Sequence, residues 1–273
     1  MSKIIDGKKI AKEIETELTS QVSLMSVPPK LSVVQIGDDP ASASYIKAKA
    51  NAASRVGIKL THHHLSKEIN INELEKLVDK LNKTEDGLII QLPIPKSLES
   101  VLERIKPEND VDGFHSENLG KLVQGIHGMV PCTPAGIIEL LYRSGNDPEG
   151  KHVVVVGRST IVGTPLSLLL SQKGVDATVT LCHSRTKSLH EHCKQADILV
   201  AAVGKANMIT KDMVKPGAVI LDVGVNRTSE GLVGDVSHDV REVASQITPV
   251  PGGVGPMTVV MLMSNTVKSA LEN

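Results

Sequence analysis

The chain has 273 residues, and 30 Lys and Arg balance 31 Asp and Glu to give a formal net charge of −1. At roughly 100 to 200 residues per domain, this length predicts one large or two ordinary domains. The balanced charge argues against a protein that binds the phosphate backbone of nucleic acids. The only aromatic residues are Tyr45, Phe114 and Tyr142. We therefore expect an aliphatic core, and no row of rings on which single-stranded nucleic acid would stack.

Apolar segments give no sign of export or of membrane insertion. Charged residues interrupt the segment Met1–Gly7 before an apolar run can build, which argues against a signal peptide. The longest apolar runs are much shorter than the about 18 residues that a membrane span needs. These runs are Val153–Val156, Ile198–Val203 and Val259–Met263. We expect a cytoplasmic protein without a membrane partner.

Cysteine and histidine residues show no metal-binding pattern. The three cysteines, an odd number without CxxC spacing, argue against a disulfide framework. The histidines and cysteines between Cys182 and Cys193 match no common zinc spacing. The run His62–His64 lies in an extended segment whose alternation would divide it over two faces. We expect no metal site, and exposed histidines.

In chain order, short β-branched runs alternate with stretches of helical periodicity, which is typical of a parallel α/β sheet. In the first half we predict helices at Gly7–Leu24, Ala41–Val56 and Ile71–Asn82, and strands at Leu31–Ile36, Ile58–Leu65 and Gly87–Leu92. In the second half we predict strands at His152–Val156, Ala177–Cys182, Ile198–Val203 and Ala218–Val223, and a last helix at Pro256–Leu271.

The turn-rich segment Ser144–Gly150 divides these two series of elements. We predict a first domain over 1–143 and a second over 144–255, with the last helix, within 256–273, returning to the first domain. The predicted fold class is α/β, with two α/β domains flanking a cleft. The second domain has the pattern of a Rossmann-like parallel sheet.

A glycine-containing turn follows the first strand of the second domain. The strand Val153–Val156 leads through Gly157 and Gly163 into the helical stretch Leu166–Leu170. Such a turn directs backbone N–H groups and the positive end of a helix toward an anion such as a pyrophosphate. The spacing differs from G-x-G-x-x-G, and a purely structural βα turn can also carry glycines.

The residues after the next strand favour NADP over NAD. An NAD enzyme usually has an acidic residue there that binds the ribose 2′-hydroxyl. This chain instead has Ser184 and Arg185, and Arg158 lies in the preceding glycine turn. Hydroxyl and guanidinium groups suit a 2′-phosphate. The alternative is that both arginines are solvated loop residues.

A lysine lies on the apolar face of the helix predicted at Ala41–Val56. At about 100° per residue, Lys49 falls on the same side as Ile46, Ala52 and Val56. Burial would favour the neutral amine or require a partner, so Lys49 is a candidate acid/base group. The alternative is a side chain whose ammonium group reaches water.

Three further segments are candidates for the same site. Gln91 follows a buried strand, at the end where ligands of open α/β sheets bind. The pair Asp110 and Asp112 precedes a glycine, where carboxylates often cap the local backbone instead. The glycine- and proline-rich run Pro249–Thr258 can bring backbone close to a flat ligand, although a linker is the alternative.

Six motifs in this order closely resemble the bifunctional methylenetetrahydrofolate dehydrogenase/methenyltetrahydrofolate cyclohydrolase (FolD) family. They are Tyr45-Ile46-Lys47-Ala48-Lys49, Gln91-Leu92-Pro93-Ile94-Pro95, Asp110-Val111-Asp112-Gly113-Phe114-His115, Pro131-Cys132-Thr133-Pro134, Gly157 to Pro165, and Pro249 to Thr258. The resemblance implies NADP-dependent oxidation of 5,10-methylenetetrahydrofolate to the methenyl form, then hydrolysis to 10-formyltetrahydrofolate. It also implies a homodimer.

The resemblance also implies roles for individual residues. Lys49 would be the catalytic lysine, Gln91 would tune it, and Asp112 would bind the pterin. Tyr45 would stack on the folate. Further substrate contacts would come from Leu92, Pro251, Gly252, Gly253 and Thr258, and NADP contacts from Gly157, Arg158, Ser159, Ile161, Ser184, Arg185 and Val225.

Three other interpretations are weighed against this one. A monofunctional, NAD-dependent member of the same family is disfavoured by Lys49 and by the cations Arg158 and Arg185 of the second domain. A shikimate or amino-acid dehydrogenase of similar plan is disfavoured by the combination of Tyr45, Lys49, Gln91 and Asp112. A non-catalytic regulator that binds NADP or folate would have no need to keep these side chains.

Overall fold

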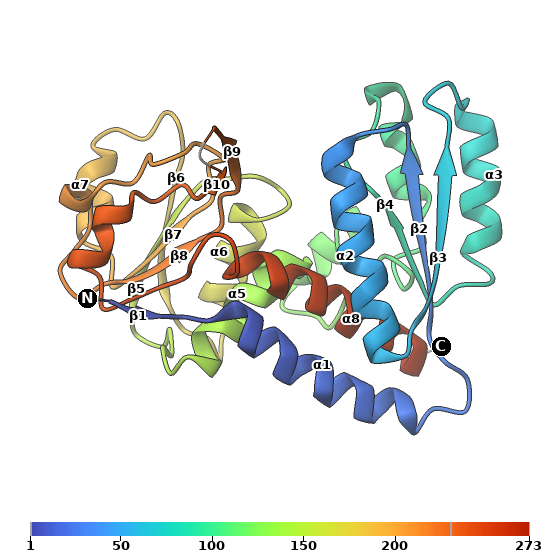
Figure 1. Cartoon of the computed structure of the whole chain (residues 1–273), viewed down its shortest axis with the longest axis horizontal. Helices are drawn as coiled ribbons and strands as arrows, with labels where there is room; N and C mark the ends of the chain where they lie inside the picture. The colour runs from blue at the N-terminus through green and yellow to red at the C-terminus, as the bar shows by residue number, and fades with distance from the viewer. Residues whose placement is uncertain (1, 230, 273) are drawn as a thin grey trace. The chain divides into compact units, whose positions relative to one another are not determined.

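The computed structural model of the protein describes residues 2–229 and 231–272 (Figure 1). The chain forms two compact units. Unit 1 contains Met1–Ala11 and Thr133–Thr258, and unit 2 contains Lys12–Cys132 and Val259–Asn273. Two helices, α1 (Gly7–Ser23) and α8 (Val254–Glu272), each begin in unit 1 and continue in unit 2.

Unit 2 is built on a three-stranded parallel sheet of order β3-β2-β4. The strands are β2 (Lys30–Ile36), β3 (Lys59–Leu65) and β4 (Gly87–Ile90), and the helices after the first two are α2 (Pro40–Val56) and α3 (Ile71–Leu81). Figure 1 shows these two helices on opposite sides of the sheet. The unit is completed by the 3-10 segment η1 (Lys96–Arg104), by α4 (Ser116–Gln124), and by most of α1 and α8.

The segment around Asp110 extends the unit 2 sheet beyond β4. Leu88 and Asp110 form an isolated parallel bridge, and the Leu88 N–H donates to the Asn109 carbonyl at 2.8 Å. The carboxyl end of β4 and the segment after Asp110 therefore reach the same edge of the sheet. This edge carries Gln91 and Asp112.

Unit 1 is built on a six-stranded parallel sheet of order β1-β11-β8-β7-β5-β6. The strands are β1 (Lys3–Ile4), β5 (His152–Val156), β6 (Thr178–Cys182), β7 (Ile198–Ala201), β8 (Val219–Asp222) and β11 (Gln246–Ile247). The helices are α5 (Cys132–Arg143), α6 (Gly163–Ser171) and α7 (Leu189–Lys194), and an antiparallel hairpin joins β9 (Asn226–Thr228) to β10 (Gly231–Val233). Two 3-10 segments are η2 (Lys211–Met213) and η3 (His238–Glu242).

The α/β class and the predicted strands are confirmed, with ends that move by at most two residues. The aliphatic core is also confirmed, because the largest fully buried side chains are isoleucines and leucines. Tyr45 and Tyr142 remain 44% and 41% exposed. The strands β1, β9, β10 and β11 and the helices α4, α5 and α7 were missed. Strands of two residues are too short to show a period.

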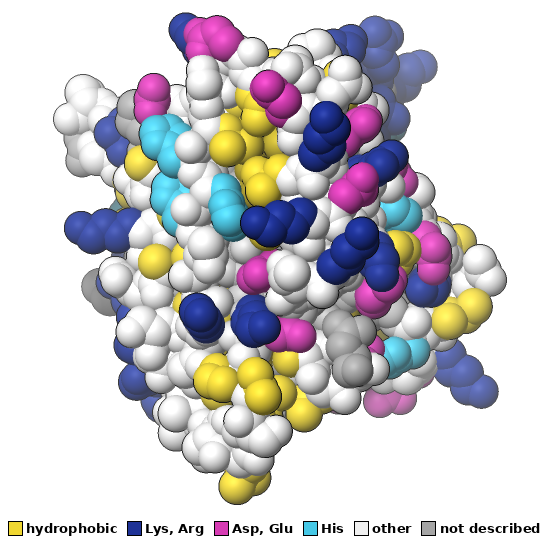
Figure 2. All heavy atoms as spheres, turned by 90° about the vertical axis from the view of Figure 1, so that its right-hand side faces the viewer, with side chains coloured by type: hydrophobic (Ala, Val, Ile, Leu, Met, Phe, Trp, Pro, Cys, Tyr) yellow, Lys and Arg dark blue, Asp and Glu magenta, His cyan; other side chains and the backbone are white. Residues whose placement is uncertain are grey.

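The three consecutive histidines lie on β3, at the edge of the unit 2 sheet, and alternate between its faces. His62 and His64 are exposed and stack at 5.9 Å between ring centroids, whereas the half-buried His63 contacts the Ser32 hydroxyl at 3.1 Å. Figure 2 shows cations and anions interspersed over one face of the molecule, with histidines among them. None of the described helices is long and apolar enough to cross a membrane.

Candidate active site

Lys49 is held inside unit 2 by its place on α2. Asp39 caps this helix by accepting from the Ser42 N–H at 2.7 Å, and Gly57 ends it at a φ of +92°. Lys49 is only 7% exposed, on the same face as the buried residues Ile46 and Ala53. The periodicity argument is therefore confirmed, and the lysine does not extend into solvent.

The buried side-chain nitrogen of Lys49 has an oriented hydrogen-bond partner in Gln91. Lys49 Nζ donates to Gln91 Oε1 at 2.9 Å. The Gln91 backbone N–H donates to the Val34 carbonyl, and its side-chain Nε2 donates to the Leu92 carbonyl at 2.9 Å. Because the amide nitrogen is engaged, the amide oxygen faces the lysine.

The two carboxylates of the Asp110–Asp112 pair have different environments. Asp110 is 4% exposed and accepts from the N–H groups of Gly113 and His115 and from Asn118 Nδ2. Asp112 is half-buried, and its carboxylate makes no hydrogen bond with any described residue. Burial raises the pKa of Asp112, the charge of Lys49 lowers it, and Asp110 raises it. Local capping thus accounts for Asp110 but leaves Asp112 available to a ligand.

The backbone beside Asp112 is tightly supported. Gly113 has a φ of +75°, and a Cβ there would lie 2.5 Å from the Pro131 nitrogen. Asn265, on α8, donates to the carbonyls of Val111 and Val130 at 2.9 and 3.0 Å. Cys132 also donates to the Val111 carbonyl, and burial raises the pKa of its thiol well above the usual range. Sequence reasoning missed Asn265, because a lone polar residue in an apolar helix does not identify its partners.

Unit 2 also has an exposed ring on α2 and a pocket that is lined in part by Leu92. Tyr45 lies one helical turn before Lys49 with its ring partly exposed. A pocket of about 470 Å³ begins at Leu92, directly after Gln91, and also includes Phe114. Its other lining residues are Pro93, Ile94, Glu99, Leu102 and Glu103. The structure therefore brings Lys49, Gln91 and Asp112 together, with Tyr45 one turn away on α2 and Leu92 next to Gln91, and all five belong to unit 2.

The glycine turn of unit 1 is closed so tightly that side chains are excluded from it. A Cβ on Gly157 would lie 2.1 Å from the Ala202 carbonyl oxygen, and one on Gly163 would lie 1.8 Å from the Gly157 oxygen. Helix α6 begins at Gly163. Its N-cap residue, Val162, makes no side-chain hydrogen bond to the start of the helix. The Thr164 N–H donates to the Ser159 carbonyl at 3.0 Å and Pro165 has no N–H, so at the start of the helix, within the described residues, the Gly163 N–H is the one left for an anion.

Side chains predicted to bind the cofactor are exposed at the carboxyl ends of the unit 1 strands. Arg158, Ser159 and Ile161 follow β5, Ser184 and Arg185 follow β6, and Val225 follows β8. The turn after β6 is ordered by its own bonds. His183 N–H donates to Thr186 Oγ1 at 2.8 Å, and Arg185 N–H donates to His183 Nδ1 at 3.1 Å. This turn presents a hydroxyl beside a guanidinium.

The loop before α8 is packed and does not behave as a flexible linker. The Gly252 carbonyl accepts from the Lys8 N–H at 3.1 Å, and a Cβ on Gly253 would lie 2.7 Å from the Pro249 carbonyl oxygen. Thr258 Oγ1 lies 2.9 Å from Thr133 Oγ1. Pro251, Gly252, Gly253 and Thr258 all belong to unit 1.

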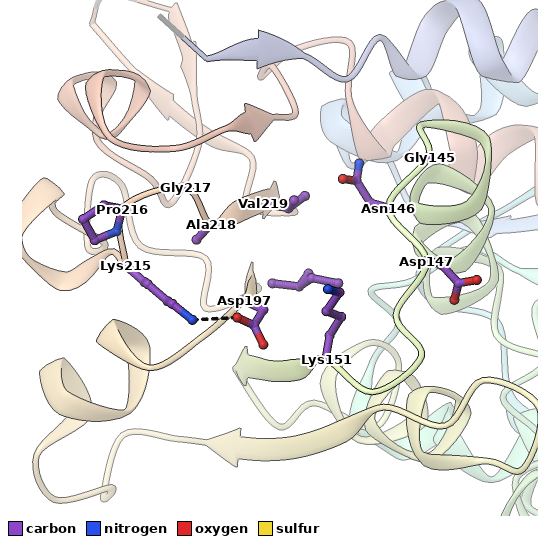
Figure 3. A pocket seen from close by; sticks show the side chains of 11 residues that line it. Gly145, Asn146, Asp147, Lys151, Asp197, Lys215, Pro216, Gly217, Ala218 and Val219 are labelled. Carbon is purple, nitrogen blue, oxygen red and sulfur yellow. Dashed lines mark hydrogen bonds and ion pairs between the residues drawn. The ribbon is translucent and has the colours of Figure 1, made fainter.

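A second pocket, of about 400 Å³, lies at the opposite, amino-terminal edge of the unit 1 sheet (Figure 3). It is lined at the beginnings of β5, β7 and β8, and Lys215 pairs there with Asp197 at 2.7 Å. None of the predicted site residues lines it. Within 2–229 and 231–272, no group of three or more His, Cys, Asp or Glu side chains is arranged to hold a metal ion.

A dinucleotide-type turn in one α/β unit and a buried lysine in the other define an α/β protein with a nucleotide-binding domain. The chain matches the tetrahydrofolate dehydrogenase/cyclohydrolase catalytic domain over residues 5–112 and the NAD(P)-binding domain of the same family over 131–273. The chain therefore belongs to the tetrahydrofolate dehydrogenase/cyclohydrolase family, as the sequence motifs predicted.

Individual relatives cover nearly the whole chain. "Bifunctional protein FolD" of Bacillus pumilus is 52% identical over 276 residues, which cover 98% of this chain and 97% of the relative. The bifunctional FolD structure from Campylobacter jejuni is 42% identical, with a TM-score of 0.96 over 100% of this chain and 99% of that one. The FolD structure from Trypanosoma brucei, complexed with NADP cofactor and inhibitor, is 37% identical, with a TM-score of 0.92 over 100% and 99%.

Proposed function

We propose that the protein is a bifunctional enzyme of one-carbon metabolism. It oxidises 5,10-methylenetetrahydrofolate to 5,10-methenyltetrahydrofolate with NADP, and it hydrolyses the methenyl form to 10-formyltetrahydrofolate. The observation that carries this proposal is the buried Lys49–Gln91 hydrogen bond, at 2.9 Å, with the Asp112 carboxylate close enough to interact with the charge of Lys49. Relatives that cover nearly the whole chain are named as bifunctional, which supports both steps.

The chemistry assigns a separate task to each unit 2 side chain. Loss of a hydride from the methylene bridge leaves a methenyl cation, and water adds to its carbon. Lys49 in its amine form accepts the proton that the water loses. The C–N bond then opens as the new hydroxyl loses its proton to become the formyl oxygen and the leaving nitrogen gains a proton. Gln91 holds Nζ in place, Asp112 accepts hydrogen bonds from pterin N–H groups, and Tyr45 stacks on the folate.

NADP, when bound, supplies the hydride acceptor. Gly157 lets the turn after β5 pack against the Ala202 carbonyl, and the turn leads to the start of α6, where a pyrophosphate would bind. Arg158, Ser184 and Arg185 would bind the 2′-phosphate. Gly157 and Ser159 would hold the phosphates, and the exposed apolar side chains of Ile161 and Val225 would cover flat parts of the cofactor.

The same proposal includes the two domains, further substrate contacts, the oligomeric state and the cellular compartment. Residues 1–143 with 256–273 would form the folate-binding catalytic domain, and 144–255 the NADP-binding domain. Leu92, Pro251, Gly252, Gly253 and Thr258 would add substrate contacts. The family resemblance supports a homodimer, and the three free, buried cysteines agree with a reducing compartment such as the cytoplasm.

A coupled assay tests the proposal. Purified protein mixed with methylenetetrahydrofolate and NADP should form a methenyl species that absorbs in the near ultraviolet and then decays by hydrolysis. Formation without decay would indicate a monofunctional dehydrogenase, and faster formation with NAD would contradict the cofactor assignment. Binding of both ligands without turnover would indicate a regulator.

A further inference from the structure

Two buried carboxylates at the carboxyl edge of the unit 1 sheet play no part in the mechanism above. Asp222 is the last residue of β8 and is 5% exposed, and Asp235 follows the β9–β10 hairpin and is 0% exposed. Neither carboxylate pairs with a lysine or arginine of the described residues. Their partners are almost all backbone N–H groups.

Asp235 binds the loop after β7 and the strand after β8 at the same time. Its Oδ2 accepts from the N–H groups of Val203 and Gly204 at 2.7 and 2.9 Å. Its Oδ1 accepts from the Lys205 N–H at 2.8 Å and from Asn226 Nδ2 at 2.9 Å. Three consecutive N–H groups of the loop are thus directed at one carboxylate.

Asp222 in turn fixes Asp235. Asp222 Oδ1 accepts from the Asp235 N–H at 2.8 Å, and Oδ2 accepts from the Val236 N–H at 3.1 Å. Each carboxylate also contacts a glycine closely. A Cβ on Gly224 would lie 2.0 Å from Asp235 Oδ1, and one on Gly234 would lie 1.7 Å from Asp222 Oδ2. Only glycine at positions 224 and 234 leaves room for the two carboxylates.

The segments that the pair holds border the glycine turn. Strands β8, β7 and β5 are neighbours in the sheet, so their carboxyl ends lie side by side. Ala202, whose carbonyl closely faces Gly157, immediately precedes the Asp235-bound loop. Val225 lies between Gly224, which contacts Asp235, and Asn226, which donates to it.

We propose that Asp222 and Asp235 are positioning residues that hold the loops after β7 and β8 in the conformation that binds the dinucleotide. This inference rests on the proposed function, because it takes NADP as the ligand of this edge. Asn at position 235 would place an NH2 group against N–H donors and leave two of them without an acceptor.

The test measures cofactor binding separately from the unit 2 chemistry. In Asp235→Asn and in Asp222→Asn, we expect the dissociation constant for NADP, measured by calorimetry, to rise at least tenfold. Hydrolysis of added methenyltetrahydrofolate without cofactor should stay within twofold of the parent rate. The amides of Val203 to Lys205 should exchange hydrogen faster in the Asp235→Asn protein without ligand. Asp147→Asn, an exposed carboxylate in the same unit, is the matched control and should change none of these values.

Other outcomes overturn the inference. If Asp235→Asn lowers the melting temperature but binds NADP as the parent does, the pair only stabilises the unit. If Asp235→Asn does not fold, Asn226→Ala, which removes one donor, should still weaken NADP about threefold, and an unchanged dissociation constant would refute the positioning role. A parent protein that neither binds NADP nor hydrolyses the methenyl substrate would refute the proposed function instead.

Discussion

The carboxyl ends of the two sheets carry different kinds of binding group. In unit 2 they present side chains, since Gln91 and Asp112 extend from the sheet edge and Lys49 reaches them from α2. In unit 1 they present exposed side chains such as Arg158 and Ser184 beside a backbone turn packed tightly at Gly157, and Asp235 binds the neighbouring loop after β7. A buried carboxylate with N–H partners builds the scaffold, whereas one without them is free to meet a ligand.

Removal of the Lys49 amine should have the largest effect. In Lys49→Met, we expect hydrolysis of methenyltetrahydrofolate to fall about 1,000-fold, which is within the range of general acid–base catalysis. The dissociation constant for NADP should stay within about twofold of the parent value, because the residues that we assign to the cofactor belong to the other unit. The decay of the methenyl absorbance measures the first effect, and calorimetry the second. Lys47→Met, on the exposed face of the same helix, is the control, and full turnover by Lys49→Met would exclude the assigned role.

Loss of the groups assigned to the 2′-phosphate should change cofactor selectivity. In the double variant Arg158→Ala and Ser184→Ala, we expect NADP to bind about 100-fold more weakly, because charge-assisted hydrogen bonds to phosphate are lost. The affinity for NAD, which has no 2′-phosphate, should fall about threefold or less. Titration of both cofactors checks this difference. Lys173→Ala, an exposed cation of the same unit, is the control, and equal losses would refute the assignment.

The Asp110–Asp112 pair allows the scaffold and ligand roles to be separated within unit 2. Asp110→Asn should lower the free energy of unfolding by about 1 to 3 kcal/mol, because buried N–H donors lose their acceptor. Asp112→Asn should change it by less than about 0.5 kcal/mol, because no protein hydrogen bond is lost, but should raise the KM for the folate. Denaturant unfolding and steady-state kinetics measure the two effects. Equal destabilisation by both substitutions would contradict the distinction.

The smallest of the expected effects is a dependence of the free energy of unfolding on pH, caused by Asp222. Burial raises its pKa from 3.8 to about 7, although the N–H groups of Asp235 and Val236 oppose the shift. The folded state then binds this proton more tightly than the unfolded state, so the stabilisation is complete below about pH 4 and is lost as the pH rises through 7. Between pH 6 and 8 we expect a loss on the order of 1 kcal/mol in the free energy of unfolding.

Denaturant unfolding at both pH values measures this loss. The Asp222→Asn protein should lose less stability over the interval than the parent does, and Asp147→Asn should lose as much as the parent. A parent protein whose stability rises between pH 6 and 8 would contradict the assignment to Asp222, unless the Asp222→Asn protein rises more steeply.

The features that the sequence predicts are those that local patterns determine. The strand Val153–Val156 shows its burial in its composition, and the place of Lys49 follows from the helical period. The partners of Asp222, Asp235 and Asn265 could not be predicted in this way, because each reaches backbone groups through the tertiary fold. The one local signal was the acidic residue Asp222 at the end of a fully buried strand, which indicates a carboxylate that needs hydrogen-bond donors.

The return of α8 to unit 2 has a consequence for synthesis on the ribosome. Asn265 donates to the carbonyls of Val111 and Val130, and the single Ser269 hydroxyl lies within hydrogen-bond distance of the carbonyls of Asp86 and Glu108. These acceptors are translated long before their donors. Lys49 can therefore be buried early, but the turn that presents Asp112 cannot be completed until α8 has left the exit tunnel. A nascent chain that stalls late should already contain the unit 1 sheet and still lack a finished folate site.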